Sequence, residues 1–241
     1  HLGGIYAFFI KVRELIKGHM INKIILVWDG QNGGLVRHNI NIDYKSNRKN
    51  KEWYVKIELT DAEIKRENEK DESILKQKIR IQQYAENLFL RQIEVDEIEA
   101  DDLIAAYCMQ YEKFESIYLY TNDRDFAQLL DLNITILFAN IETPVTRVNY
   151  MMHFNHHYSN ALTLKIICGD VSDNLKGIEG IGEDTLLKHF PELKFKHVTV
   201  REICRRADEI NKERVLNKKK PLKALENLLK NIDRLRTNYQ L

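Results

Sequence analysis

Apolar residues recur along the chain with two periods, that of an amphipathic helix and that of short buried strands. Residues 4–17 carry apolar side chains at helical spacing and predict an amphipathic helix. Residues 23–28, KIILVW, are a short β-branched run that predicts a buried strand ending at Asp29. Two further strands are predicted at 116–120 and 133–138. Because these strands alternate with helical segments, the pattern predicts an α/β fold with a central, mostly parallel sheet flanked by helices.

The rest of the chain is mostly helix-favouring. The highly charged stretch from residue 50 to about 91 predicts a solvated or mobile first part, followed by a helix packed on the core. Further helices are predicted at 97–112 and 161–168, and the chain after about residue 200 is helical and basic. No apolar run approaches the roughly 18 residues needed to cross a bilayer. We therefore expect a core at 1–160 and a helical C-terminal region at 161–241.

Charge and cysteine content narrow the class of protein. The chain has 37 Lys and Arg against 36 Asp and Glu, a net charge of +1 that is not typical of a nucleic-acid binder. The charges are nevertheless unevenly distributed along the chain, because four basic residues lie in the segment from Lys45 to Lys51. The three cysteines are far apart and never form a CxxC pair, which favours a reduced, cytosolic protein.

Acidic residues gather at the ends of predicted elements. They form four groups: Asp29; Glu99, Asp101 and Asp102; Asp123 and Asp125; Asp170 and Asp173. Ligands of open α/β sheets bind outside the carboxyl ends of the strands, where Asp29 and the Asp123/Asp125 pair are expected. Carboxylates brought close together repel one another unless cations neutralise them. Oxygen ligands without His or Cys partners indicate Mg²⁺ or Mn²⁺ rather than Zn²⁺.

Simpler interpretations stay open at this point. A single Asp after a strand is commonly a turn residue or a helix cap, and the acidic run at 94–102 fits a solvated face. The basic segment fits an exposed loop, and the glycines of GIEGIG fit a turn between two packed helices. The HxxHH tract at 153–157 lacks the Cys partners of a common zinc site.

Five motifs, in this order, resemble the 5′ nuclease family, which includes phage 5′ nucleases, bacterial polymerase-associated 5′→3′ exonuclease domains and eukaryotic flap endonucleases. The motifs are VWDGQNGG, DYKSNRK, EADD, TNDRDFAQLL and GDVSDNLKGIEGIGEDTLLKHF. The resemblance covers about residues 3–190 and is strongest to the phage and bacterial branch. It implies a PIN-like fold with a helical arch at about 45–72 and a helix–three-turn–helix DNA-binding element at about 161–190.

The resemblance also assigns roles to residues. Asp29, Glu99, Asp101 and Asp102 would form the tighter of two divalent-metal sites, and Asp123, Asp125, Asp170 and Asp173 would complete the pair. Lys45 and Arg48 would contact the scissile phosphate, and Tyr44 would stack on a base. The residues expected to bind DNA are Lys49, Gly177, Gly180, Ile181, Gly182, Thr185 and Lys188, with a K⁺ ion held by the glycine-rich turn.

One family feature is not in this sequence. The first metal-ligand Asp of the family lies on a strand upstream of the helix that begins here near Gly4, so we expect either that a segment precedes His1 or that the protein is truncated.

The expected function is a structure-specific, metal-dependent 5′ nuclease. It would hydrolyse 5′ ends or flaps of DNA or RNA–DNA duplexes during replication or repair, in the cytoplasm of a bacterium or a phage-infected host. A single-strand-binding protein or a clamp stays open as a partner. One alternative is a catalytically impaired homologue that binds branched DNA. Another is a toxin-like PIN ribonuclease, which the long arch segment and the glycine turn disfavour.

Overall fold

The computed structural model describes residues 3–46 and 61–241. The chain forms two compact units, one from His1–Gly34 with Arg48–Leu103 and the other from Leu35–Asn47 with Ile104–Leu241. Across the described ranges, no helix is both long enough and apolar enough to span a membrane.

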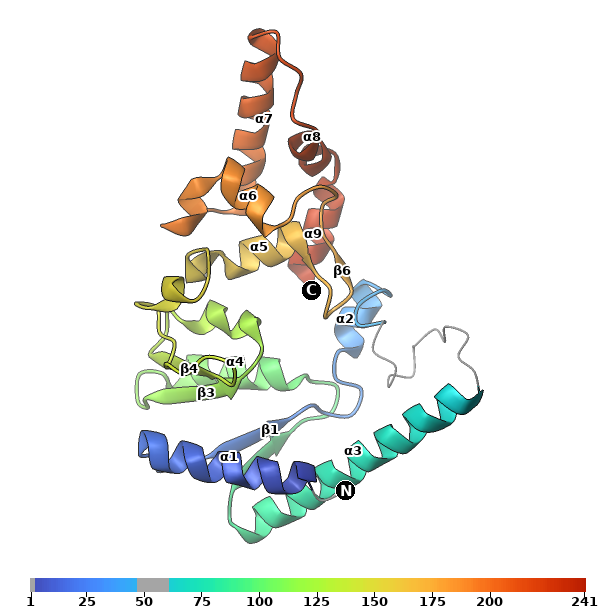
Figure 1. Cartoon of the computed structure of the whole chain (residues 1–241), viewed down its shortest axis with the longest axis vertical. Coiled ribbons are helices and arrows are strands. Elements are labelled where there is room, and N and C mark those ends of the chain that lie inside the picture. Colours follow the sequence, from blue (N-terminus) through green and yellow to red (C-terminus); the bar gives the residue numbers. More distant parts are fainter. Residues whose placement is uncertain (1–2, 47–60) are drawn as a thin grey trace. The chain divides into compact units, whose positions relative to one another are not determined.

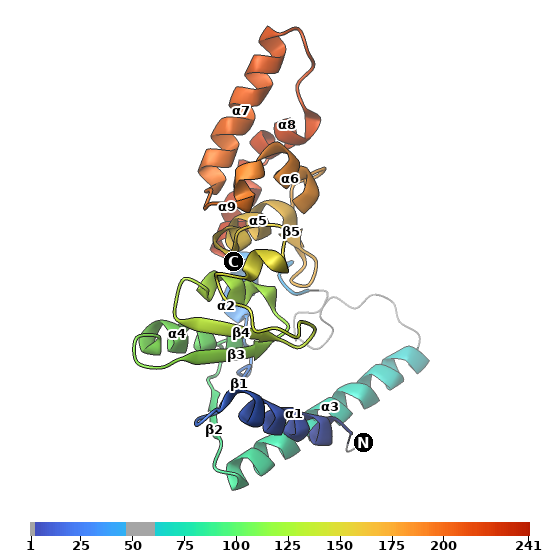
Figure 2. The same ribbon diagram turned by 60° about the vertical axis from the view of Figure 1, so that its left-hand side comes forward.

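The first unit is built around a parallel pair of strands. It contains α1 (Gly3–His19), β1 (Ile25–Trp28), α3 (Asp61–Asn87) and β2 (Arg91–Glu94), and β1 pairs with β2 from Ile25↔Arg91 to Trp28↔Glu94. Aromatic contacts join these elements, because Phe8 of α1 stacks on Trp28 of β1 and Phe9 meets Tyr84 of α3 edge to face. Figures 1 and 2 both show α1 lying alongside α3.

Two predictions for this unit need correction. Residues 91–94, RQIE, form the strand β2, which the sequence did not predict, and the helix predicted to about residue 91 ends at Asn87. This strand is short and is held by its pairing with β1, which its own composition does not signal. Residues 61–72 of the predicted arch, expected to be solvated or mobile, belong to the continuous helix α3. Residues 47–60 of that arch lie outside the described residues.

The second unit contains a second parallel strand pair. It includes α2 (Leu35–Ile40) and most of α4 (Ala100–Tyr111), whose first turn belongs to the first unit. The pair is β3 (Ile117–Thr121) with β4 (Ile134–Phe138), and the 3₁₀ helix η1 (Arg124–Leu129) connects them. A core covers this pair, formed by Cys108, Phe126, Ala127, Leu130, Ile134, Ile136, Phe138, Val145 and Tyr150.

The C-terminal part of this unit is helical. Its elements are η2 (Tyr150–Met152), η3 (Tyr158–Asn160), α5 (Ala161–Cys168), β5 (Gly169–Asp170), β6 (Leu175–Lys176), α6 (Glu183–His189), η4 (Pro191–Lys194), α7 (Val200–Leu216), α8 (Lys223–Lys230) and α9 (Ile232–Gln240). β5 and β6 pair antiparallel and bring Asp170 opposite Leu175. A second core, which includes Ile167, Ile181, Leu186, Ile203 and Leu228, holds α5 to α9 together.

Polar side chains secure this helical region as well. The buried Asn160 amide donates to the carbonyls of Leu193 and Lys196 and accepts from the Val198 amide. Asn238 of α9 donates to the carbonyls of Ile166 and Lys176. Buried side-chain amides that are hydrogen-bonded in this way favour one arrangement of the elements.

The predicted α/β class with parallel strands is confirmed. The strands predicted at 23–28, 116–120 and 133–138 correspond to β1, β3 and β4. The predicted domain boundary near residue 160 stays a prediction. The two compact units divide the chain at other positions.

Candidate metal centre

The first acidic group is assembled where β1 ends and α4 begins. Asp29 follows β1 directly, and its carboxylate accepts a 2.9 Å hydrogen bond from the Ala100 amide, at the start of α4. The next residue, Gly30, is buried and donates its amide to the Ile98 carbonyl at 3.1 Å. A Cβ at Gly30 would lie 1.7 Å from the Val95 carbonyl oxygen, so only glycine allows this approach.

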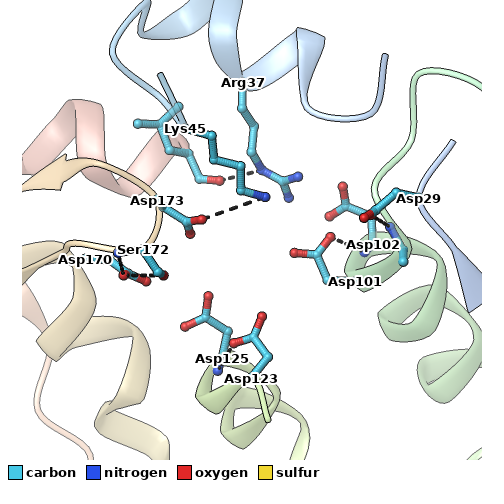
Figure 3. Close-up of polar contacts among 12 residues, drawn as sticks. Asp29, Arg37, Lys45, Asp101, Asp102, Asp123, Asp125, Asp170, Ser172 and Asp173 are labelled. Atoms are coloured by element: carbon cyan, nitrogen blue, oxygen red, sulfur yellow. Dashed lines mark hydrogen bonds and ion pairs between the residues drawn. The ribbon is translucent and has the colours of Figure 1, made fainter. Parts of the chain in front are cut away.

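Three further carboxylates belong to the same start of α4. Glu99, Asp101 and Asp102 each place an oxygen within 4.8 Å of the others. The Glu99 side chain is buried, at 3% exposure. Figure 3 shows Asp101 and Asp102 on the first turn of α4, next to Asp29. The positive end of the helix dipole stabilises anions here, but three adjacent carboxylates still favour a hard divalent cation.

The second acidic group lies entirely in the second unit. Asp125, Asp170 and Asp173 also place one oxygen each within 4.8 Å of one another. Asp123 caps η1 by accepting a 2.9 Å hydrogen bond from the Asp125 amide, so it positions Asp125 on the loop after β3. Asp170 ends β5 and accepts from the amide and the hydroxyl of Ser172, as Figure 3 shows.

Lys165 of α5 lies among these three acids and was not predicted. Its Nζ is 3.0 Å from Asp170 Oδ2 and 2.8 Å from Asp173 Oδ2, and it also pairs with Asp125. Its only sequence signal is that it is the one charged residue in the apolar helix ALTLKIIC. Such a lysine in a half-buried helix needs a partner, and here the partner is the acidic group.

The ionisation of this group follows from burial and from Lys165. Burial raises the pKa of Asp125 above its ordinary value, although Lys165 counteracts this effect. Burial also opposes ionisation of Asp170, but hydrogen bonds from Ser172 and Lys165 outweigh it and hold the pKa of that carboxyl below its ordinary range. Burial disfavours the charged form of Lys165 as well, but the surrounding carboxylates, led by Asp125, raise its pKa. The lysine therefore stays a cation.

Lys45 approaches the same acids from the DYKSNRK segment. Its amide donates to the Asp173 carbonyl at 2.8 Å, and its Nζ lies 3.8 Å from Asp173 Oδ1. Both side chains are buried, at 5% and 8% exposure. Asn174 strengthens the connection by donating to the Asp43 carbonyl and to the Ser46 hydroxyl, each at 2.8 Å. The structure thus brings the predicted Lys45 and Asp173 together.

The other three predicted residues of this segment are Tyr44, which is buried, and Arg48 and Lys49. Tyr44 is buried, at 3% exposure, with the Lys45 ammonium 4.9 Å from its ring centre. The ring is therefore not accessible for base stacking in this structure, which corrects that expectation. Arg48 and Lys49 lie outside the described residues.

The glycine-rich turn is a tight, braced connection between α5 and α6. A Cβ at Gly177 would lie 2.0 Å from the Cys168 carbonyl oxygen, and Gly180 has a φ of 81°. Ile178 and Ile181 turn inward to the C-terminal core. Asn227 of α8 donates to the Glu179 carbonyl at 3.0 Å and so connects the turn to α8.

The predicted DNA-contact residues of this turn divide by exposure. Gly180, Gly182 and Lys188 are exposed, and Gly177 and Thr185 are partly exposed. Ile181 is buried and its amide donates to the Ile178 carbonyl. Ile181 is therefore a core residue by its side chain, and that it contacts DNA stays a prediction.

The eight predicted metal ligands thus fall into two groups, one in each unit. Asp29, Glu99, Asp101 and Asp102 belong to the first unit, and Asp123, Asp125, Asp170 and Asp173 to the second. Each group offers only oxygen ligands, a donor set that fits Mg²⁺ or Mn²⁺. That both groups share one centre stays a prediction.

Known proteins similar to this chain are described as 5′-3′ exonucleases. Residues 1–158 match the family described as 5′-3′ exonuclease, N-terminal resolvase-like domain. The 5′-3′ exonuclease of Mycoplasmopsis pulmonis is 30% identical over 197 residues, which cover 79% of this chain and 59% of the relative. That of Halalkalibacterium halodurans is 25% identical over 191 residues, covering 78% and 57%. The chain thus spans less than two thirds of the length of these relatives.

Solved structures with the same fold come from bacteriophage T5. The T5 5′-exonuclease with bound zinc has a TM-score of 0.70 at 19% identity, covering 98% of this chain and 79% of the other. The T5 flap endonuclease, in a pseudo-enzyme-product complex with DNA and metal ions, has a TM-score of 0.71 at 19% identity and the same coverage. At this identity the likeness shows the fold, and the family match over 158 residues decides membership. The chain belongs to the 5′-3′ exonuclease family.

Proposed function

We propose that this chain is the nuclease part of a metal-dependent phosphodiester hydrolase that cuts DNA or RNA–DNA duplexes at 5′ ends or flaps. The observation that carries the proposal is the pair of acidic groups, each with three carboxylate oxygens within 4.8 Å. In a 5′-3′ exonuclease family member, such groups have a ready explanation as ligands of divalent ions. On a solvated acidic face the carboxylates would be exposed, whereas Glu99 and Asp173 are buried.

The two acidic groups would hold two Mg²⁺ or Mn²⁺ ions. Bound there, the ions would supply an activated water and charge stabilisation at the leaving oxygen. The chain itself supplies fixed cations, because Lys165 and Lys45 both lie within reach of Asp173. An ammonium held in this way can bind a phosphate oxygen while neutralising part of the acidic group.

The glycine-rich turn would hold the duplex part of the substrate. Its exposed Gly180 and Gly182 bring the backbone to the surface, and α6 begins directly after them with Lys188 exposed near its end. Amides at a turn can bind a phosphate, and carbonyls there can hold a K⁺ ion. Such contacts are made to the backbone, so binding would tolerate any sequence and weaken with salt.

A cleavage assay with matched variants tests the proposal. Labelled 5′-flap DNA, nicked duplex and single-stranded RNA are incubated with the chain in Mg²⁺, in Mn²⁺ or in EDTA. We expect flap cleavage with either metal and none in EDTA. Asp102→Asn and Asp170→Asn should lower it by more than the roughly 10- to 100-fold that loss of an outer-shell partner costs. Asp233→Asn is the control, since that carboxylate is 96% exposed and belongs to neither group.

The principal alternative is a homologue that binds branched DNA without cutting it. Flap binding in Mg²⁺ with no cleavage, unchanged in all three variants, would support that alternative and contradict a hydrolase. Preferential cutting of single-stranded RNA would instead indicate the PIN ribonuclease. A single-strand-binding protein or a clamp as partner, and action in a bacterial or infected-host cytoplasm, are proposed on the same family grounds.

A further inference from the structure

The second unit carries an apolar groove that the proposed nuclease function does not use. It runs between the C-terminal end of α7 and α8, which Figures 1 and 2 show side by side. Val215, Leu216, Pro221 and Leu229 line it together with the polar Asn211, Lys212 and Glu226, and its volume is about 530 Å³. That lies within the roughly 300 to 1,000 Å³ typical of ligand pockets. Leu216 is 83% exposed and Val215 is 56% exposed, so the apolar lining faces solvent.

Hydrogen bonds fix the backbone that forms the groove. After α7, the Lys218 and Lys219 amides donate back to the carbonyls of Val215 and Arg214. The Arg214 side chain donates to the Lys220 carbonyl at 2.9 Å. Asn211 accepts from the Leu222 amide at 2.8 Å and also donates to its carbonyl. Because these bonds fix the connection between the helices, the groove is formed before any partner binds, which lowers the entropic cost of binding.

Positive charge predominates in the segment that forms the groove. Residues 211–230 carry seven basic and two acidic side chains, a local net charge of +5 in a chain whose total is +1. Lys218, Lys219, Lys220 and Lys223 are all exposed. Among the residues that the structure describes, none of these four forms an ion pair, whereas Lys212 pairs with Asp208. Their charge is therefore available to an external anion.

We infer that the α7–α8 groove docks an acidic peptide segment of a partner protein, whose apolar side chains enter the groove while its carboxylates meet the lysines. Apolar lining and basic rim together favour this occupant. A nucleic-acid backbone would use the rim but offers nothing to bury against Leu216. A second copy of this chain would bring the same positive charge and repel it. Buried apolar anchors within a charged rim are the usual energetic pattern of specific interfaces.

Fluorescence anisotropy with the full chain tests the inference. The probes are a labelled pool of acidic peptides that carry two Leu or Phe residues at all short spacings, and a matched pool with Ser at those positions. We expect at least one apolar-bearing peptide to bind about tenfold more tightly than its Ser counterpart. Leu216→Ser and Lys219→Ser should each weaken it, and added salt should weaken it further. Phe195→Ser and Lys196→Ser are controls on exposed residues away from the groove.

Three results would overturn the inference. The first is that no peptide in the pool binds more tightly than its Ser counterpart. The second is that Lys219→Ser weakens duplex DNA binding while Leu216→Ser changes nothing, which would assign the surface to nucleic acid. The third is a concentration-dependent dimer in sedimentation that Leu216→Ser abolishes. The inference is independent of the nuclease proposal, because Asp170→Asn should leave peptide binding intact, and Leu216→Ser should leave flap cleavage intact.

Discussion

The ammonium of Lys165 lies 2.8 Å from the carboxylate of Asp173, inside a group of three acids that the sequence alone marked as metal ligands. The contact joins the fifth residue of α5 to the loop after β5, and it is completed by Asp170 and Asp125. Lys165 therefore neutralises part of the negative charge of these acids, which a divalent ion would otherwise have to neutralise alone. Its positive charge also opposes the binding of a divalent ion at these acids.

Removing this lysine should make the fold more dependent on metal. In Lys165→Met the three acids lose their nearest cation, so their repulsion rises and the melting temperature in EDTA falls. A divalent ion then meets one positive charge fewer and binds more tightly, so the increase in melting temperature on adding Mn²⁺ should exceed that of the wild type. Thermal unfolding with and without Mn²⁺ measures both effects. Lys176→Met is the control, since that lysine is exposed. Equal Mn²⁺ responses in wild type and Lys165→Met would contradict the prediction.

The glycine turn should tolerate alanine at one position and not at its neighbours. Gly182→Ala meets nothing within 4 Å and has no positive φ, so its stability should be nearly unchanged. Gly180→Ala also meets nothing but keeps a φ of 81°, which costs about 1 kcal/mol. Gly177→Ala places a Cβ 2.0 Å from the Cys168 carbonyl oxygen and should be the most destabilising. Urea unfolding ranks the three, and any other order would contradict the geometry.

A capping box holds the start of α7 and should give a measurable stability loss when removed. The Thr199 hydroxyl accepts from the Glu202 amide at 3.2 Å, while Glu202 accepts from the Thr199 amide at 2.8 Å. Thr199→Ala should cost about 1 kcal/mol, and Thr199→Ser much less, because Ser retains the hydroxyl. For a chain of this size that cost corresponds to a fall of about 2 to 4 °C in melting temperature. A Ser variant as unstable as the Ala variant would argue against the cap.

The same box predicts a pH dependence. Hydrogen bonds from Thr199 hold the pKa of Glu202 below its ordinary value. A carboxyl whose pKa is lower in the folded state than in the unfolded state contributes stability above the unfolded value, near 4.3, and loses it as pH falls through the folded value. The stability difference between wild type and Glu202→Gln should therefore shrink as pH falls below about 4. Paired urea titrations at pH 6 and pH 3 check the sign.

The thiols should be protected while the protein is folded. Burial raises the pKa of Cys168 to about 12 and that of Cys108 to about 11. At pH 8 the thiolate fraction of Cys168 is then on the order of one in ten thousand, and the thiolate is the reactive form. A disulfide reagent should therefore label these two cysteines slowly in buffer and rapidly in urea. Fast labelling of Cys168 in the folded protein would contradict the raised pKa of this partly buried thiol.

Several features of this protein were set by local sequence. The β-branched runs predicted β1, β3 and β4, because a short buried strand needs apolar side chains on both faces. The acids at the ends of these strands were visible for the same reason, since the chain must turn there and polar residues mark the turn. The order of the motifs was enough to indicate the family that the comparison over residues 1–158 then established.

Other features depend on contacts between residues far apart in the chain, and only the tertiary structure decided them. β2 forms because it pairs with β1, some 66 positions away in register, and Lys165 is a partner of Asp125 because α5 crosses η1. Tyr44 was expected to stack on a base from a basic loop, yet Asn174 and Asp173 hold that loop by hydrogen bonds to Asp43 and Lys45, and the Tyr44 ring is buried. Periodicity reports which face of one element is apolar. It carries no information on which distant segment covers that face, since that choice is made by the packing of the whole unit.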